Sequence, residues 1–271
     1  MPLRQHAKSL ETLYGVYNRR EYVHPDPLEC LYGYQDPCDR EVVGLIASSL
    51  AYGRVRQILA SVKWVLDRLG PQPARTLADR RPSQLAATVA DFRHRFQTGL
   101  EMAALLAGMR SMIRRHGSLG RGFLAAVEPA DPTVQPALGR WVGELAAAGE
   151  GRCGHLLPDP AKGSACKRLH LYLRWMVRSD DVDPGGWEGV RAARLIVPLD
   201  THMHHLAREL GATARAAADL RTAEEITAAF RKLSPDDPVK YDFALTRLGI
   251  HPDTDMGAFL AECGRQVVKN A

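Results

Sequence analysis

The segment Ile196-Val197-Pro198-Leu199-Asp200-Thr201-His202-Met203-His204-His205-Leu206-Ala207-Arg208-Glu209-Leu210-Gly211 joins a short apolar run to a helical pattern. Asp200 stands at the junction, where a helix takes its N-cap residue. Its carboxylate can accept hydrogen bonds from the free N–H groups of the first turn, and the positive end of the helix dipole favours its ionised form. A carboxylate fixed there suits a simple cap, or a site where positive charge develops. The rest of the chain favours the second interpretation.

The composition is that of a globular protein with a sizeable core. The chain has 271 residues, of which 45% are hydrophobic, and a formal net charge of +5, which is compatible with a polyanionic partner. Its five cysteines include no C-x-x-C pair, so we expect no zinc knuckle, no iron–sulfur cluster, no disulfide framework and no cofactor. No apolar run is long enough for a membrane span, and the N-terminus lacks a signal peptide, so a bacterial cytoplasmic protein is expected.

Helical periodicity dominates the sequence, and strand alternation is scarce, so the fold class is predicted as all-α. The strongest pattern runs from Arg40 to Leu69 with Asp39 as its cap, and Gly53 divides it into two helices. The other expected helices are 10–17, 82–96, 99–116, 119–127, 133–148, 164–178, 203–210, 223–233 and 237–248, the last ending at Gly249.

A turn that opens a helix, Leu156–Leu169, carries two lysines, Lys162 and Lys167, close to exposed backbone N–H groups. Such a turn can hold a DNA phosphate through backbone amides and basic side chains. A lysine amine at this position is also a candidate nucleophile toward carbon. Two solvated surface lysines are the simpler alternative.

Further candidates follow along the chain. Trp175 suits either core packing or stacking on a base, and the capped helix after Pro238 offers Asp242 and Phe243 as pocket residues. A metal site is not expected, because the acidic cluster at 180–183 lacks the later acidic ligand of a calcium loop. The histidines at 202, 204 and 205 also lack the i, i+4 spacing of a zinc helix.

Several of these motifs resemble one family of uncharacterised bacterial proteins. Lys-Arg (167–168) with Leu-Arg-Trp-Met-Val-Arg (173–178), then Pro-Leu-Asp-Thr-His (198–202) and Asp-Pro-Val-Lys-Tyr-Asp-Phe-Ala-Leu (237–245), is similar to the DUF2400 family. This resemblance covers nearly the whole chain.

The segment Leu-Asp-Thr-His, followed by a helix ending in Leu-Gly, also resembles helix-hairpin-helix DNA glycosylases such as endonuclease III. The resemblance implies Asp200 as the catalytic acid. Lys167 lies 33 residues before Asp200, a spacing similar to that of archaeal 8-oxoguanine glycosylases, which implies Lys167 rather than Lys162 as the Schiff-base lysine. Three features depart from the endonuclease III pattern: the hairpin reads Leu157-Pro158-Asp159-Pro160-Ala161-Lys162-Gly163, the four-cysteine cluster is absent, and the spacing from Lys167 to Asp200 is longer.

The resemblance implies a single glycosylase-like domain over 1–271, with helical lobes of about 40–160 and 161–250 around a cleft and the terminal segments packed on them. It implies a monomeric base-excision DNA repair enzyme, an N-glycosylase with AP lyase activity, that acts on double-stranded DNA containing a damaged purine such as 8-oxoguanine. The implied base pocket is Tyr52, Trp175, Phe243 and Asp242, and the implied DNA contacts are Lys162, Arg168 and His202. A non-catalytic nucleic-acid binder and a metal-dependent hydrolase using His202, His204, His205 and Asp200 are the alternatives.

Overall fold

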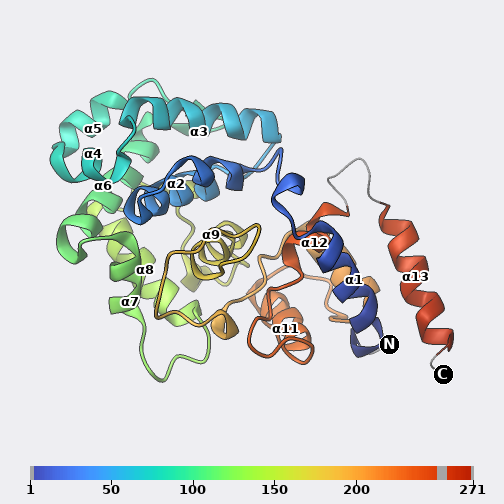
Figure 1. The fold of residues 1–271 in the computed structure, drawn as a ribbon. Coiled ribbons are helices and arrows are strands. Elements are labelled where there is room, and N and C mark those ends of the chain that lie inside the picture. The colour runs from blue at the N-terminus through green and yellow to red at the C-terminus, as the bar shows by residue number, and fades with distance from the viewer. Residues whose placement is uncertain (1–2, 249–254, 270–271) are drawn as a thin grey trace.

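A computed structural model describes residues 3–248 and 255–269, and these are mostly helical, which confirms the all-α prediction (Figure 1). The α-helices are α1 (Ala7–Tyr17), α2 (Pro37–Ser49), α3 (Val55–Leu69), α4 (Pro73–Asp79), α5 (Pro82–Thr88), α6 (Gly99–His116), α7 (Leu119–Ala126), α8 (Gln135–Ala148), α9 (Lys167–Val177), α10 (Thr201–Glu209), α11 (Leu220–Arg231), α12 (Asp242–Arg247) and α13 (Met256–Lys269). The strands β1 (Arg93–His94) and β2 (Gln97–Thr98) form an antiparallel hairpin. Short 3-10 helices are η1 (Leu3–His6), η2 (Arg20–Tyr22), η3 (Pro27–Gly33), η4 (Gly154–Leu156), η5 (Pro160–Lys162) and η6 (Ala192–Arg194). Within the described residues no helix has the length and apolar character needed to cross a bilayer.

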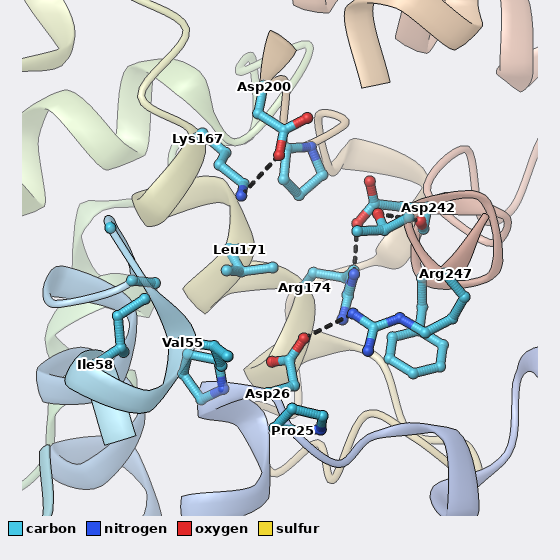
Figure 2. A pocket seen from close by; sticks show the side chains of 16 residues that line it. Pro25, Asp26, Val55, Ile58, Lys167, Leu171, Arg174, Asp200, Asp242 and Arg247 are labelled. Carbon is cyan, nitrogen blue, oxygen red and sulfur yellow. Dashed lines mark hydrogen bonds and ion pairs between the residues drawn. The ribbon is translucent and has the colours of Figure 1, made fainter. Parts of the chain in front are cut away.

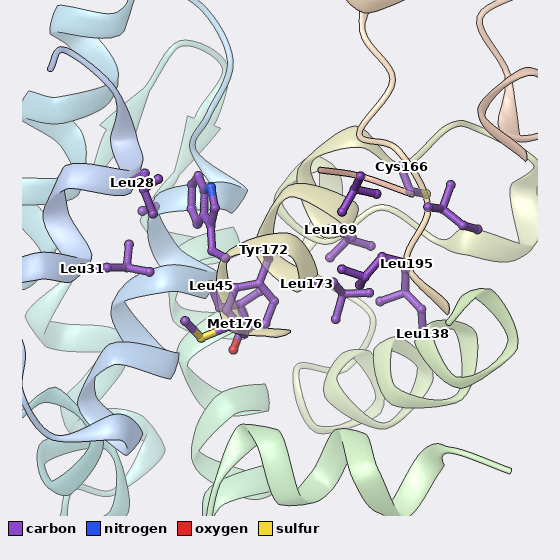
Figure 3. Packing of buried hydrophobic residues seen from close by; sticks show 14 of the residues in the cluster. Leu28, Leu31, Leu45, Leu138, Cys166, Leu169, Tyr172, Leu173, Met176 and Leu195 are labelled. Atoms are coloured by element: carbon purple, nitrogen blue, oxygen red, sulfur yellow. The ribbon is translucent and has the colours of Figure 1, made fainter. Parts of the chain in front are cut away.

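The helix α9 lies in the middle of the molecule. Figure 1 shows α2 to α8 on one side of it and α1, α11, α12 and α13 on the other. Figure 3 shows Leu169, Tyr172, Leu173 and Met176 of α9 packed among apolar side chains from several elements, and all four are buried. A helix that is buried around most of its circumference is typical of the centre of a larger protein.

The expected break in the helical pattern at Gly53 is confirmed, because α2 ends at Ser49 and α3 begins at Val55. The predicted cap was wrong by three residues. Asp36 caps α2 by accepting hydrogen bonds from the N–H groups of Cys38 and Asp39, and a proline follows it at the first helical position. The carboxylate of Asp39 instead accepts from the backbone N–H of Ala74 at the start of α4, a helix that the sequence analysis did not predict.

Two predicted helices are much shorter in the structure than the sequence pattern predicts. The helix expected over 82–96 ends at Thr88, and the β1–β2 hairpin follows it, with Arg95 at its tip in the left-handed region at φ 56°. The helix expected over 237–248 covers only α12, because residues 237–241 form turns around a proline, which cannot supply a backbone N–H. Its expected end, Gly249, lies outside the described residues, and helix α13 was not predicted.

The close approach of α6 and α8 depends on a glycine, which gives a stability prediction. A Cβ built on Gly108 would lie 2.5 Å from the backbone carbonyl oxygen of Leu145. Gly108→Ala should therefore force the two helices apart and lower the free energy of unfolding by about 1–3 kcal/mol, with a lower Tm in thermal unfolding.

The matched control is Gly143→Ala on α8, where a Cβ would meet no atom within 4 Å. That change should raise stability by up to about 1 kcal/mol, because alanine is the better helix former. Equal Tm values for the two variants would contradict the proposed close contact.

Candidate active site

Lys167 and Asp200 form an ion pair at the starts of two helices. Lys167 is the first residue of α9, and its Nζ lies 2.9 Å from Oδ2 of Asp200. The other carboxylate oxygen, Oδ1, accepts hydrogen bonds from the backbone N–H groups of His202 and Met203 at 3.0 and 2.8 Å, so Asp200 is the N-cap of α10 as predicted. The two side chains retain 34% and 29% exposure, so both stay accessible to a ligand.

The environment of Asp200 favours its ionised form. Burial alone would raise the pKa of this carboxyl, but the charge of Lys167 and the N–H of Met203 outweigh burial and hold the pKa below its usual range. Asp200 is therefore a fixed negative charge at neutral pH, at the mouth of a helix.

The pair lies at one end of a cavity of about 190 Å³, drawn in Figure 2. Three residues of α9 line it from one face, Lys167, Leu171 and Arg174, which follow the i, i+4, i+7 spacing of a helix. The remaining lining comes from residues far apart in the chain: Pro25, Asp26, Pro27, Ala51, Gly53, Val55, Ile58, Pro198, Asp200, Asp242, Phe243, Thr246 and Arg247.

Two further ion pairs lie in the same cavity as the lysine–aspartate pair (Figure 2). Arg174 pairs with Asp242, and Nη2 of Arg247 lies 2.8 Å from Oδ2 of Asp26. The ring of Phe243 lies near both arginines, with its centroid 5.8 Å from Cζ of Arg174 and 4.5 Å from Cζ of Arg247. Burial raises the pKa of Asp242 above its usual value, and the charge of Arg174 opposes that rise. The cavity wall thus combines a buried aromatic ring with paired donors and acceptors.

The structure brings four predicted site residues together, because Lys167, Asp200, Asp242 and Phe243 all line the cavity. Tyr52 is half-buried at its edge, between the lining residues Ala51 and Gly53.

Two predicted roles need correction. The Trp175 side chain is fully buried in the core and does not line the cavity, because it follows Arg174 and is turned about 100° away from it around the helix axis. The guanidinium of Arg168 is also buried and donates to the backbone carbonyls of Ser49 and His155, so it braces the protein and is not displayed to a phosphate.

The remaining predicted DNA contacts lie nearby but outside the cavity lining. Lys162 is exposed at the end of η5, within the segment 157–163. The His202 side chain is half-buried on the first turn of α10. Among the described residues no group of three or more histidine, cysteine, aspartate or glutamate side chains could hold a metal ion, so the three histidines and Asp200 do not converge.

Sequence reasoning missed Asp26, Arg174 and Arg247 as cavity residues. Arg174 could have been found from the residues alone, because it lies seven residues after Lys167 and so shares its helical face. Asp26 had no comparable signal, since only the tertiary fold brings this segment to α12.

Comparison with known proteins gives one finding. A family model described as "Protein of unknown function (DUF2400)" matches residues 26–251, which include every lining residue except Pro25. No curated protein and no solved structure matches the chain. The match covers well over half of the sequence, and the chain therefore belongs to the DUF2400 family.

Proposed function

We propose that this protein is a DNA repair glycosylase with AP lyase activity that excises a damaged purine, with 8-oxoguanine as the leading substrate. The observation that carries the proposal is the Lys167–Asp200 pair, an amine and an ionised carboxylate 2.9 Å apart at the end of a cavity. The resemblance of the Leu-Asp-Thr-His segment to helix-hairpin-helix glycosylases supports the same chemistry.

The size and lining of the cavity suit a single base that has left the DNA stack. Its volume of about 190 Å³ is below the ~300–1,000 Å³ of common ligand pockets, so it fits one ring system better than a whole nucleotide. Phe243 and Asp242 are part of the cavity wall, with 1% and 4% of their surfaces exposed, and Asp242 is the acceptor on that wall nearest to Arg174. An enzyme that acts on a base in duplex DNA has to flip that base into such a pocket.

The reaction follows from the two side chains. Asp200 takes a proton from the Lys167 ammonium, and the free amine attacks C1′ of the nucleotide while the bond from C1′ to the base breaks. The base leaves with the electron pair of that bond and takes up the proton that Asp200 accepted, so Asp200 is ionised again. Asp200 also stabilises the positive charge that develops on the sugar, an electrostatic contribution that is large in a fixed, partly dry site. The sugar ring opens as the amine proton passes to the ring oxygen, which gives a Schiff base on Lys167. Loss of a proton from C2′ and departure of the 3′ phosphate then cleave the strand.

We propose that the protein acts as a monomer on double-stranded DNA in the bacterial cytoplasm. A non-catalytic nucleic-acid binder on the same scaffold is the alternative, and the experiments below separate the two.

Asp200→Asn should abolish base excision and leave DNA binding largely intact. Asparagine caps helices about as well as aspartate, so α10 should still form, but the negative charge beside the sugar is lost. Single-turnover excision from an 8-oxoguanine duplex and thermal unfolding measure the two effects. If the wild-type protein excises no lesion and Asp200→Asn melts far below wild type, then Asp200 is only a helix cap.

Lys167→Gln should remove the adduct that borohydride traps on the same duplex, because no amine remains to form the imine. The matched control is Lys162→Gln, since Lys162 is exposed and does not line the cavity. Trapping that survives Lys167→Gln and disappears with Lys162→Gln would assign the nucleophile to the hairpin.

The logarithm of the affinity for duplex DNA should fall linearly with the logarithm of the salt concentration. The slope should be about −0.9 per phosphate contacted, because neutralised phosphates release counterions. Lys162→Gln should make the slope shallower by about one. Affinity that does not change with salt would argue against a nucleic-acid partner.

Incubation with a chelator should leave excision unchanged, because the amine and carboxylate chemistry requires no Lewis acid. Metal content of the purified protein, measured together with activity, checks this. Loss of bound metal in step with loss of activity would favour the hydrolase alternative.

A further inference from the structure

An exposed aromatic side chain marks the tip of the β1–β2 hairpin. Phe96 is 60% exposed, although phenylalanine is usually buried. Its ring lies 5.7 Å from that of Tyr52, at an interplanar angle of 33°, and 5.4 Å from that of His155. The ring is therefore supported by two aromatic neighbours, and the rest of it faces solvent.

The support beneath Phe96 is well fixed. The Tyr52 ring packs edge-on against His94 and His155, with centroids 4.8 and 5.1 Å apart, and the guanidinium of Arg168 lies over it at 4.9 Å. The ring nitrogens of His94 form hydrogen bonds with the Ser61 hydroxyl and with the backbone carbonyl of Tyr52. Burial, helped by the charge of Arg168, lowers the pKa of His155, which favours a neutral ring at pH 7.

This cluster lies at the edge of the catalytic cavity. Gly53, which follows Tyr52, lines the cavity and has a positive φ of 97°. The Arg95 side chain lies over it, with Nη1 3.1 Å from the position that a Cβ would occupy. The tip of the hairpin therefore lies beside a residue of the cavity wall.

The charge around the hairpin suits a phosphate backbone. Four exposed arginines lie on the hairpin and on the segment that follows Gly53: Arg54, Arg56, Arg93 and Arg95. Two acidic residues flank the hairpin in the sequence, the exposed Asp91 and the half-buried Glu101. The carboxylate of Glu101 accepts from the backbone N–H of Thr98 within the cap of α6, so part of that negative charge is engaged by the protein. The net charge of these four arginines and two acidic residues is positive.

We propose that Phe96, supported by Tyr52 and His155, is a stacking platform for the nucleobase that neighbours the nucleotide held in the cavity. The inference rests on the proposed function, because flipping one base out of a duplex leaves its neighbour without a stacking partner. An aromatic ring with a free face replaces that partner for any base, since every base has a π face. The arginines hold the flanking phosphates, and the base in the cavity makes no contact with Phe96.

The test uses a duplex with a tetrahydrofuran abasic site and 2-aminopurine as the next base, so that binding is measured without chemistry. Wild-type protein should bind it and quench the 2-aminopurine. Phe96→Ala should bind about tenfold more weakly and lose the quenching, and Phe96→Trp should retain both. Val16→Ala, a change at an exposed apolar residue of α1, should leave both unchanged. Arg56→Gln should weaken binding in a salt-dependent way and keep the quenching.

The outcomes separate the platform from the enzyme. Wild-type protein that excises and traps a lesion, with Phe96→Ala equal to it in affinity and quenching, overturns the platform alone. Binding and quenching restored by Phe96→Leu would mean simple apolar contact and would also overturn it. Quenching that depends on Phe96, in a protein that excises no lesion, supports the platform and overturns the glycosylase proposal. Absence of any duplex binding overturns both.

Discussion

The paired charges buried along α9 are the constraint on which the rest of the structure depends. Arg174 and Arg178 are 3% and 5% exposed, so each needs carboxylate partners, because an unpaired buried charge is strongly destabilising. Asp183, which is fully buried, pairs with both arginines. Arg178 also binds Asp180 and Asp237, at 2.8 and 2.9 Å. Burial would lower the pKa of Arg178, but these carboxylates raise it, so the charge persists. The network therefore holds the turn after α9 and the turn before α12 in fixed positions.

The same network shapes one wall of the cavity. Asp242 is both a partner of Arg174 and a cavity residue, so its carboxylate is fixed before any ligand arrives. At the other end of the helix, Lys167 begins α9 and meets Asp200, which is held by the N–H groups of α10. Groups whose positions are set by the fold need no rearrangement when charge develops, which is the basis of electrostatic catalysis. The buried interior of α9 thus explains why a charged pair at its end can be rigid and still half-exposed.

Local patterns predicted much of this, and long-range contacts account for what they missed. The helix α6 was expected with its observed bounds, since a Thr98 cap and Gly117 delimit a regular apolar period. Asp200 and Lys167 were also found, because a capping aspartate and a lysine at a helix start are visible in sequence. Trp175 was placed in the pocket, but its side chain is in the core, since composition alone does not fix the direction of a side chain. Asp26 was missed, because its place opposite Arg247 depends on packing between residues 221 positions apart.

Two carboxylates of the cavity have pKa values shifted in opposite directions, and this suggests different roles for them. The charge of Lys167 and the backbone N–H of Met203 lower the pKa of Asp200, despite its burial. Burial raises the pKa of Asp242, and the charge of Asp200 raises it further. The charge of Arg174 opposes this rise. Neighbouring acids whose pKa values are separated in this way commonly take different parts in a reaction. In the proposed reaction, Asp200 then suits the sugar, where a cation would develop. Asp242, paired with Arg174 beside the ring of Phe243, suits the edge of a base that presents an N–H group.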